Sequence, residues 1–215
     1  MAKLDKKLKK IWKLEKKLNS IKSTLLKLAD DKESLVRCDA VESLAYFYDG
    51  DIDRKILERL EDRDNLVRVT ALESIILPQN IDRVFKKIAK NLNSSDVLVR
   101  AYAVDALAYN NAKKYRKKIK KLLKKEKSDE VLVRIYYAMV KFGDKKYLQN
   151  LINLLKSREY VVRIVAGKYL YYLTNKKNHK MILKKLKESL KDEKIRAVKF
   201  SIKEAIEKIE NREYS

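Results

Sequence analysis

The chain has little of what sheet-containing folds require. Only three glycines and one proline occur among its 215 residues. Strand-rich folds need such residues at tight hairpin turns, and dinucleotide-binding folds need glycine in a phosphate loop. Gly50, Gly143 and Gly167 stand alone rather than in a glycine-rich loop. The composition therefore favours helices that are joined by short polar turns.

The single cysteine and the single histidine exclude several kinds of site. Cys38 has no second cysteine with which to form an intrachain disulfide. A zinc site built from cysteine and histidine needs about four ligands. His179 lies among Lys176, Lys177 and Lys180, which lower its basicity rather than orient it as a general base. We therefore expect no metal site, no cofactor and no catalytic residues, and we predict that the protein is not an enzyme.

Long hydrophobic runs are also missing. No segment approaches the roughly 20 apolar residues of a membrane-spanning helix, and the basic N-terminus lacks the apolar stretch of a signal peptide. A lone cysteine suits a reducing compartment. These absences predict a cytoplasmic protein without a membrane span. Apolar residues still make up 46% of the chain, which at this length is enough for a sizeable core.

What the sequence does contain is an internal repeat. Arginines that mostly follow two aliphatic residues recur 29 to 34 residues apart, as in Leu66-Val67-Arg68 and Leu98-Val99-Arg100. An alanine usually stands three residues after the arginine, although Tyr137 and Lys199 depart from this pattern. An acidic residue precedes each arginine by four positions: Glu33, Asp64, Asp96, Glu130, Glu159 and Asp192.

Each repeat is predicted to be a pair of helices. In the second helix, apolar residues recur at helical spacing for about four turns. Its acid lies in the first turn, where the helix dipole favours negative charge, and we expect it to face the arginine four residues on. A single helix pair cannot bury its apolar face, whereas stacked pairs can.

The motif acid-x-x-[Val/Ile]-Arg-x-x-Ala-x-x-x-Leu resembles the HEAT-repeat family, specifically its PBS-lyase-type HEAT-like subclass, over residues 20–211. The resemblance implies an all-α fold, a right-handed α-α superhelix (solenoid) of about six two-helix repeats. It also implies that the first helices lie on the convex side and the second helices line a concave groove. In that family the repeated arginines form a structural ladder between repeats, a role that falls here on Arg37, Arg68, Arg100, Arg134, Arg163 and Arg196.

We predict one HEAT-like domain over residues 1–215, with helix-pair repeats over 20–211 and a tail over 212–215. Residues 1–19 are predicted to be a basic N-terminal capping helix, because a solenoid end must be covered. A helix that lies on a membrane surface and a helix that binds a partner are the alternatives. Lysines occupy most of this segment, and its apolar side consists of Leu4, Leu8, Ile11, Leu14 and Leu18.

Positive charge is in large excess and is unevenly distributed. The chain carries 53 Lys and Arg against 30 Asp and Glu, a formal net charge of +23. The excess lies mostly in segments 3–17, 113–127 and 176–191, which are the cap and two predicted first helices. Such clusters attract phosphates. The densest one supplies an alternative phosphate-binding set: Lys113, Lys114, Arg116, Lys117, Lys118, Lys120, Lys121 and Lys124.

The second helices have a different character. Positions two and five after each arginine are expected to face the groove, which makes its first half acidic and its middle aromatic. Tyrosine is common at recognition surfaces because it offers a large, stiff contact with a polar tip. Such a groove suits a basic or amphipathic peptide. Its predicted binding residues are Asp39, Glu42, Glu73, Tyr102, Asp105, Tyr109, Tyr136, Met139, Lys168 and Tyr172.

Two functions remain open at this point. The first is a non-enzymatic scaffold, monomeric by default, that binds a protein or peptide segment in its concave groove. The second is a nucleic-acid-binding protein that uses its lysine-rich surface. An auxiliary lyase subunit and a DNA glycosylase, both suggested by related HEAT-like proteins, have less support. No bilin-binding pattern is visible, and the only tryptophan, Trp12, lies outside the predicted groove.

Overall fold

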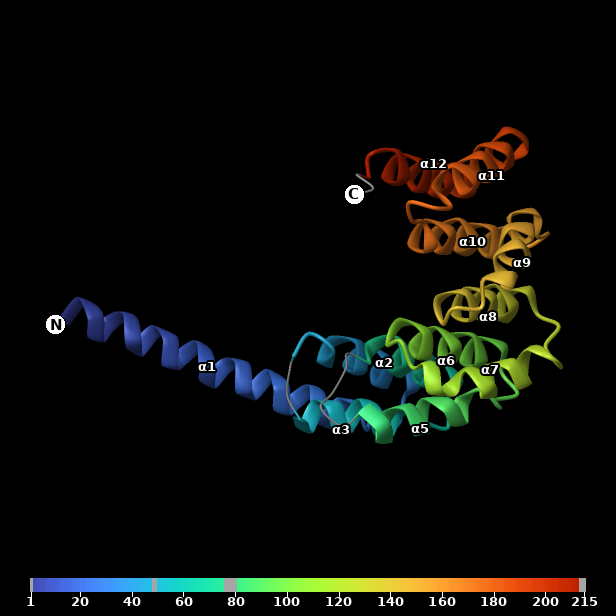
Figure 1. The fold of residues 1–215 in the computed structure, drawn as a ribbon. Coiled ribbons are helices and arrows are strands. Elements are labelled where there is room, and N and C mark those ends of the chain that lie inside the picture. Colours follow the sequence, from blue (N-terminus) through green and yellow to red (C-terminus); the bar gives the residue numbers. More distant parts are fainter. Residues whose placement is uncertain (1, 48–49, 76–80, 213–215) are drawn as a thin grey trace. The chain divides into compact units, whose positions relative to one another are not determined.

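The computed structural model describes residues 2–47, 50–75 and 81–212. This part of the chain forms twelve α-helices and three short 3-10 helices, with turns between them. The chain divides into two compact units, residues 1–88 and residues 89–215, and each unit is described by itself. The arrangement confirms the prediction of an all-α repeat fold (Figure 1).

The first unit consists of α1 (Ala2–Leu28), α2 (Ser34–Leu44), α3 (Gly50–Arg59), α4 (Asn65–Ser74) and the first part of α5 (Ile81–Asn91). Helix α2 is central because it contacts α1, α3 and α4. Leu44 of α2 and Ile52 of α3 are fully buried in the core that these helices share.

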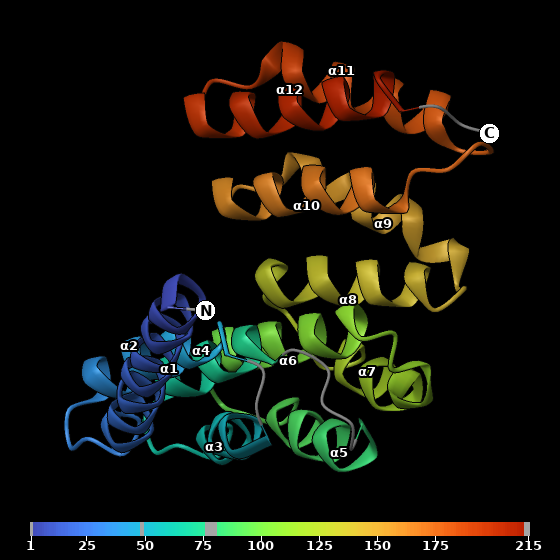
Figure 2. The same ribbon diagram turned by 90° about the vertical axis from the view of Figure 1, so that its left-hand side faces the viewer.

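The second unit repeats a helix pair three times after α6 (Val97–Tyr109). The pairs are α7 (Arg116–Leu123) with α8 (Asp129–Lys141), α9 (Leu148–Asn153) with α10 (Tyr160–Leu173), and α11 (His179–Asp192) with α12 (Arg196–Glu210). Short 3-10 helices flank two of the first helices: η1 (Lys113–Tyr115) precedes α7, while η2 (Lys145–Tyr147) and η3 (Leu154–Lys156) flank α9. The second helices form one layer, in which α6 contacts α8, α8 contacts α10 and α10 contacts α12 (Figure 2).

Two acids of the repeat motif cap the starts of helices. Asp64 is the N-cap of α4 and accepts a hydrogen bond from the backbone N–H of Leu66 at 2.8 Å. Asp96 caps α6 in the same way by accepting from the N–H of Val99 at 2.9 Å. Such caps satisfy backbone donors that a helix start would otherwise leave open. The expectation that each acid faces the arginine four residues on is met by Glu130 and Arg134, at 3.7 Å.

The N-terminal helix differs from the predicted cap. Helix α1 runs without interruption from Ala2 to Leu28, across the boundary expected between residues 19 and 20. Leu14 and Leu18 are 57% and 52% exposed, so the apolar side expected to cover the end of the solenoid faces solvent. Of the predicted tail, residues 213–215 lie outside the described residues.

Three of the repeated arginines bridge successive repeats with the same contacts. The guanidinium of Arg37 donates from Nε and Nη2 to the carboxylate of Asp62, at 3.0 and 2.8 Å. Its Nη1 donates to the backbone carbonyls of Asp31 and Lys32. Arg100 binds Glu126 in the same bidentate manner, and Arg163 binds Glu193. The carboxylate lies 25 to 30 residues after the arginine, so the partner is this later acid rather than the acid four residues earlier.

The remaining three arginines differ. The partners of the three bridging arginines stand at varying distances before the next arginine of the series: Asp62 is six residues before Arg68, and Glu126 is eight residues before Arg134. Arg134 turns instead to an acid of the preceding repeat, as described below. The other two are Arg68, which donates to the side chain of Asn65, and Arg196, which is exposed.

The Glu193 carboxylate gives the ladder a pH dependence. Its hydrogen bonds to Arg163 lower the pKa of Glu193 from 4.5 to about 2. A depressed pKa means that the stabilisation is complete above the unfolded value and is lost as the pH falls toward 2. We therefore expect Glu193→Gln to lower the free energy of unfolding by about 1.5–3 kcal/mol at pH 7. In urea titrations the difference from wild type should shrink toward zero between pH 4.5 and pH 2.

Other carboxylates protonate in the same pH range, but they do so in both proteins, so the difference between the two curves isolates Glu193. A difference that stays constant between pH 7 and pH 2 would show that the Glu193 carboxylate is not held ionised by Arg163.

Candidate interaction surface on the second helices

The predicted groove residues of the first unit are three exposed acids. Asp39 and Glu42 lie on α2, and Glu73 lies on α4. Their union with residues of the second unit into a single groove stays a prediction.

In the second unit, Asp105 is the centre of a polar network that joins three second helices. Its carboxylate accepts a hydrogen bond from Nε of Arg134 on α8 at 2.9 Å. It also accepts one from the hydroxyl of Tyr169 on α10. The Arg134 side chain is only 5% exposed and that of Asp105 is 26% exposed. A buried arginine is thus neutralised by a carboxylate of the preceding repeat.

Aromatic rings surround this network. The rings of Tyr137 and Tyr169 stack at 10°, with centroids 4.1 Å apart. The guanidinium of Arg134 lies over the ring of Tyr102, 5.0 Å from its centroid. Stacked rings and cation–π contacts each add modest stabilisation beyond the area that they bury. The hydrogen bonds and rings hold the side chains in fixed positions.

Cations and exposed tyrosines form the rim. The ammonium group of Lys141 lies 5.7 Å from the ring of Tyr137 and 5.9 Å from that of Tyr109. Lys168 lies 5.8 Å from the ring of Tyr172. Together with the centre these residues form a connected surface, which we call the tyrosine cluster: Tyr102, Asp105, Tyr109, Arg134, Tyr137, Lys141, Lys168, Tyr169 and Tyr172.

The contact between Tyr169 and Asp105 links two helices that are not neighbours in the layer. Asp105 lies on α6 and Tyr169 on α10, and these helices flank α8. The two side chains therefore reach past α8 on one face of the α6–α8–α10 layer. That this face is the concave wall of a groove stays a prediction.

Burial changes the pKa values within the cluster. It raises the pKa of Tyr137 to about 12 and that of Tyr169 well above 10.0. It also raises the pKa of Asp105 despite the nearby Arg134, and it lowers the pKa of Lys141. The tyrosines therefore stay neutral, and the carboxylate is occupied by internal partners. The charges at the rim of this cluster are those of Lys141 and Lys168, so its surface is cationic rather than acidic.

Two predicted groove residues lie elsewhere. Met139 is fully buried in the core, because its position on α8 faces the interior rather than the groove. Tyr136 is half-buried and stacks on Tyr147 of η2, with ring centroids 5.9 Å apart. It therefore packs toward the following first helix.

Four members of the cluster were not among the predicted groove residues, although Arg134 was predicted for the ladder. They are Arg134, Tyr137, Lys141 and Tyr169. One signal was present in the sequence, because Tyr137 stands where the repeat expects alanine. A tyrosine at a position that normally allows close helix approach indicates a local change in packing, and this change creates the stack with Tyr169.

The alternative phosphate-binding set lies on η1 and α7. All eight of its side chains are exposed, while Ile119 and Leu122 of the same helix are buried. Arg116 pairs with Asp144 at 3.1 Å, and Lys114 and Lys118 lie near the ring of Tyr115. The set is therefore a solvent-facing cationic helix face.

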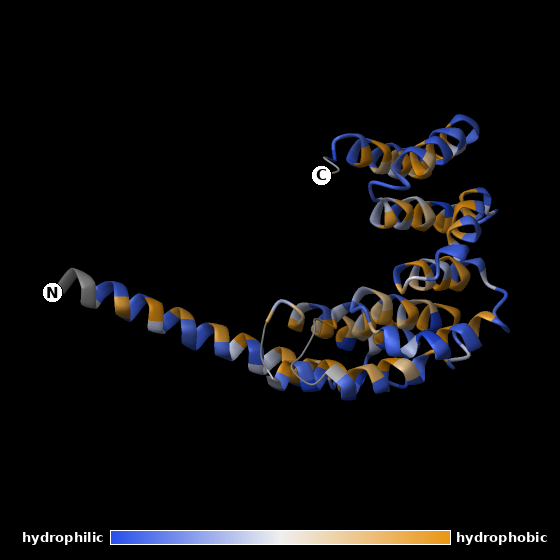
Figure 3. Cartoon of the chain, viewed as in Figure 1, coloured by the Kyte–Doolittle hydropathy of each residue, from blue (hydrophilic) through white to orange (hydrophobic). Residues whose placement is uncertain are grey.

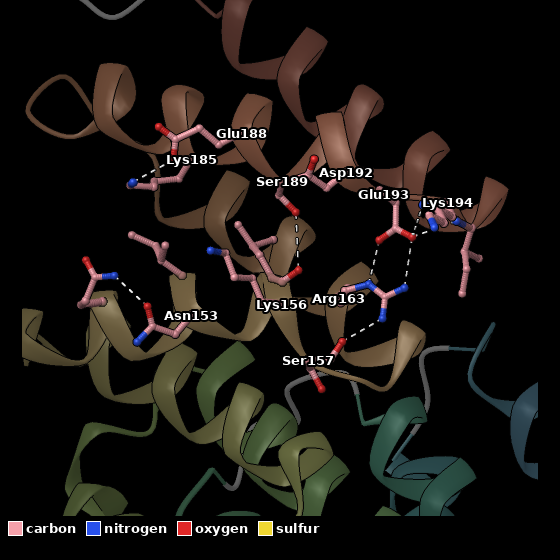
Figure 4. A pocket seen from close by; sticks show the side chains of 14 residues that line it. Asn153, Lys156, Ser157, Arg163, Lys185, Glu188, Ser189, Asp192, Glu193 and Lys194 are labelled. Carbon is pink, nitrogen blue, oxygen red and sulfur yellow. Dashed lines mark hydrogen bonds and ion pairs between the residues drawn. The ribbon is translucent and has the colours of Figure 1, made fainter.

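A pocket beside Arg163 is formed by α9, η3 and α11 (Figure 4). Its charged groups face one another: Arg163 binds Glu193, and Lys185 binds Glu188 at 2.8 Å. The hydroxyl of Ser189 donates to the carbonyl of Leu155 at 3.4 Å. These walls therefore belong to the packing between repeats.

The described part of the chain contains no group of His, Cys, Asp and Glu side chains arranged to hold a metal ion. Cys38 is buried. Among the described helices, none combines the length and the apolar character that crossing a membrane requires.

Comparisons with known proteins agree with this architecture. Residues 85–170 match the family model of HEAT repeats, whereas no curated protein matches the sequence. The complex of CpcE and CpcF of phycocyanin lyase from Nostoc sp. PCC7120 is similar in structure, with a TM-score of 0.60 and 16% identity over 87% of this chain and 82% of that chain. The Escherichia coli protein YibA gives a TM-score of 0.55 and 24% identity over 89% of this chain and 75% of that chain.

An engineered protein is also similar, with a TM-score of 0.50 and 20% identity over 89% of this chain and 99% of that chain. Likeness at these identities concerns the fold. The repeat motif, the paired helices and these matches show a HEAT-like repeat fold. Repeats of this kind stack into extended surfaces that generally mediate protein interactions.

Proposed function

We propose that the protein is a non-enzymatic scaffold that binds a protein segment through the tyrosine cluster. The observation that carries the proposal is the combination of a fixed centre with exposed rings. Tyr109 is 78% exposed and Tyr172 is 51% exposed, while the hydrogen bonds of Asp105 hold the centre in place. Rigid, exposed tyrosines lose little conformational entropy on binding.

The charged side chains at the rim of the tyrosine cluster indicate which kind of protein segment it would bind. Lys141 lies near the exposed ring of Tyr109 and Lys168 near that of Tyr172, and the one carboxylate of the cluster is already paired. An amphipathic segment with apolar and acidic side chains fits this surface. Charge of that sign also speeds association, since the chain as a whole is cationic.

The test uses peptides selected from a random library on the wild-type protein. We expect Tyr109→Ala with Tyr172→Ala to weaken the selected peptides at least about tenfold in fluorescence anisotropy. Tyr46→Ala is the matched control, because Tyr46 is 80% exposed on the first unit, and it should leave the affinity unchanged. The proposal fails if the double variant binds the peptides as tightly as wild type.

The nucleic-acid alternative rests on the exposed cationic face of α7. This alternative is tested by titrating a labelled DNA duplex with the protein in the same anisotropy assay, at low and at moderate salt. Duplex binding that survives the tyrosine substitutions but is lost on reversing Lys117, Lys118, Lys120 and Lys121 to Glu would favour this alternative. If, in addition, no peptide can be selected on the wild-type protein, nucleic-acid binding would replace the scaffold as the proposed function.

A further inference from the structure

The exposed part of α1 carries a regular apolar seam. Ile11, Leu14, Leu18 and Ile21 follow one another at spacings of three, four and three residues. Their exposed fractions lie between 43% and 57%. Apolar and polar segments alternate along the helix (Figure 3). Four large aliphatic side chains in one line are unusual on a solvated helix, and they indicate a surface that a partner covers.

The spacing of the apolar residues in the seam indicates contact with another helix. An alternation of three and four residues places side chains at the a and d positions of a heptad repeat, the pattern of a coiled coil. Leu25 and Leu28 continue the same heptad toward the region where α1 contacts α2. Leu8 and Trp12, which are also exposed, occupy e and b positions, but between Leu14 and Ile21 the apolar residues lie only at a and d. Such a stripe is narrower than the apolar face of a helix that lies in a membrane interface. The seam is therefore shaped for another helix.

The charged residues beside the seam indicate which charge a partner helix should carry. With Ile11 at position a, Lys10 and Lys17 occupy g positions, while Glu15 and Lys22 occupy e positions. Residues 6–22 contain eight lysines and one glutamate. In a parallel pair of two copies, Lys10 would face Glu15 of the other copy, but Lys17 would face its Lys22, and both helices would bring an excess of positive charge. A second copy of this chain is therefore a poor occupant, whereas an acidic helix is complementary.

We propose that α1 between Leu8 and Lys22 docks an acidic amphipathic helix of a partner protein as a heteromeric coiled coil. Aliphatic residues of that helix would cover the seam, and glutamates at its flanks would face Lys10, Lys17 and Lys22. This surface is separate from the tyrosine cluster, so the inference does not depend on the proposed function.

The energetics of an exposed helix also favour a partner for α1. A helix without tertiary contacts gains little stability in water, because the first turn is costly and later turns add little each. Most of α1 up to Ile21 is exposed, so it lacks the packing that stabilises the other helices. A partner helix that buries the seam would supply this packing. Binding is therefore expected to increase the helix content of α1 as well as to hide its apolar side chains.

The test uses the full-length protein and a synthetic acidic peptide of three heptads, with Leu or Ile at a and d and Glu at e and g. We expect Lys10→Glu with Lys17→Glu to weaken binding at least about tenfold in isothermal titration calorimetry. Lys13→Glu with Lys16→Glu changes the net charge equally but at positions outside the seam, and it should alter the affinity less than about twofold. Leu14→Gln with Leu18→Gln should also cost at least about tenfold while leaving the circular dichroism of the free protein unchanged.

Three results would overturn the proposal. Equal losses from the two lysine pairs would show charge attraction without a seam. Binding to vesicles of phosphatidylserine and phosphatidylcholine, without binding to the peptide, would assign the helix to a membrane surface. Dimerisation in sedimentation equilibrium that Leu14→Gln with Leu18→Gln abolishes would assign the seam to a second copy. Tyr109→Ala with Tyr172→Ala should not change binding of the acidic peptide, which keeps this test separate from that of the cluster.

Discussion

Replacing Arg37 with methionine should destabilise the first unit by about 3–5 kcal/mol. The side chains of Arg37 and Asp62 are 4% and 3% exposed and are joined by two hydrogen bonds. Methionine retains much of the volume of arginine but leaves the Asp62 carboxylate buried without its bidentate partner. Removing one member of a buried ion pair costs far more than the pair contributes net. Urea unfolding followed by circular dichroism at 222 nm measures the loss.

Two control variants test whether the loss of stability comes from breaking a buried ion pair. Lys32 and Glu33 form an ion pair at 4.0 Å with side chains that are 86% and 68% exposed, so Glu33→Gln should change stability by less than about 1 kcal/mol. Combining Arg37→Met with Asp62→Leu should recover part of the lost stability, because the buried carboxylate is then removed and Arg59 keeps its ion pair with Asp30, although the backbone N–H of Asp64 loses its acceptor. A loss below about 1 kcal/mol for Arg37→Met would contradict the structural role of the ladder.

The second large effect concerns Asp105. Changing it to alanine should cost about 3–5 kcal/mol, because Arg134 would lose its closest carboxylate while remaining buried. Glu130, at 3.7 Å from Arg134, limits the loss but cannot replace the hydrogen bond of Tyr169 to Asp105. Near-ultraviolet circular dichroism of the tyrosines should change together with the urea midpoint, since the stack of Tyr137 and Tyr169 would loosen.

Glu42 offers the matched control for Asp105. It occupies the same position of an earlier repeat, five residues after the repeated arginine, yet it is exposed. Glu42→Ala should therefore change stability by less than about 0.5 kcal/mol. Equal, small effects at both positions would show that Asp105 is an ordinary surface acid and that the centre of the tyrosine cluster is not held together by its carboxylate.

The arginine ladder shows which contacts the periodicity of the sequence can predict and which it cannot. The repeated arginines were recognisable because their spacing is regular, and so was the presence of an acid four residues earlier. The true partners, such as Asp62 and Glu193, lie in turns one repeat later, where no fixed spacing marks them. Two acids of the motif, Asp64 and Asp96, satisfy open N–H groups at helix starts instead, a local role that competes with side-chain pairing along the helix.

The tyrosine cluster was predicted in part. Tyr102, Asp105, Tyr109, Lys168 and Tyr172 follow from counting positions after the arginine, and the structure brings these five together. The same counting failed for Met139, because a helix face defined by spacing says nothing about which neighbour covers it. Counting positions within one repeat also could not show that Arg134 binds Asp105, an acid of the preceding repeat, instead of a later acid.

The sequence by itself determined the helical fold, the recurrence of helix pairs and the surplus of positive charge, because these depend on composition and on spacing within one helix pair. Tertiary structure decided which acid each arginine binds, which tyrosines meet and that the apolar side of α1 is exposed. These outcomes depend on contacts between residues about thirty or sixty positions apart. Such contacts form only when successive repeats stack.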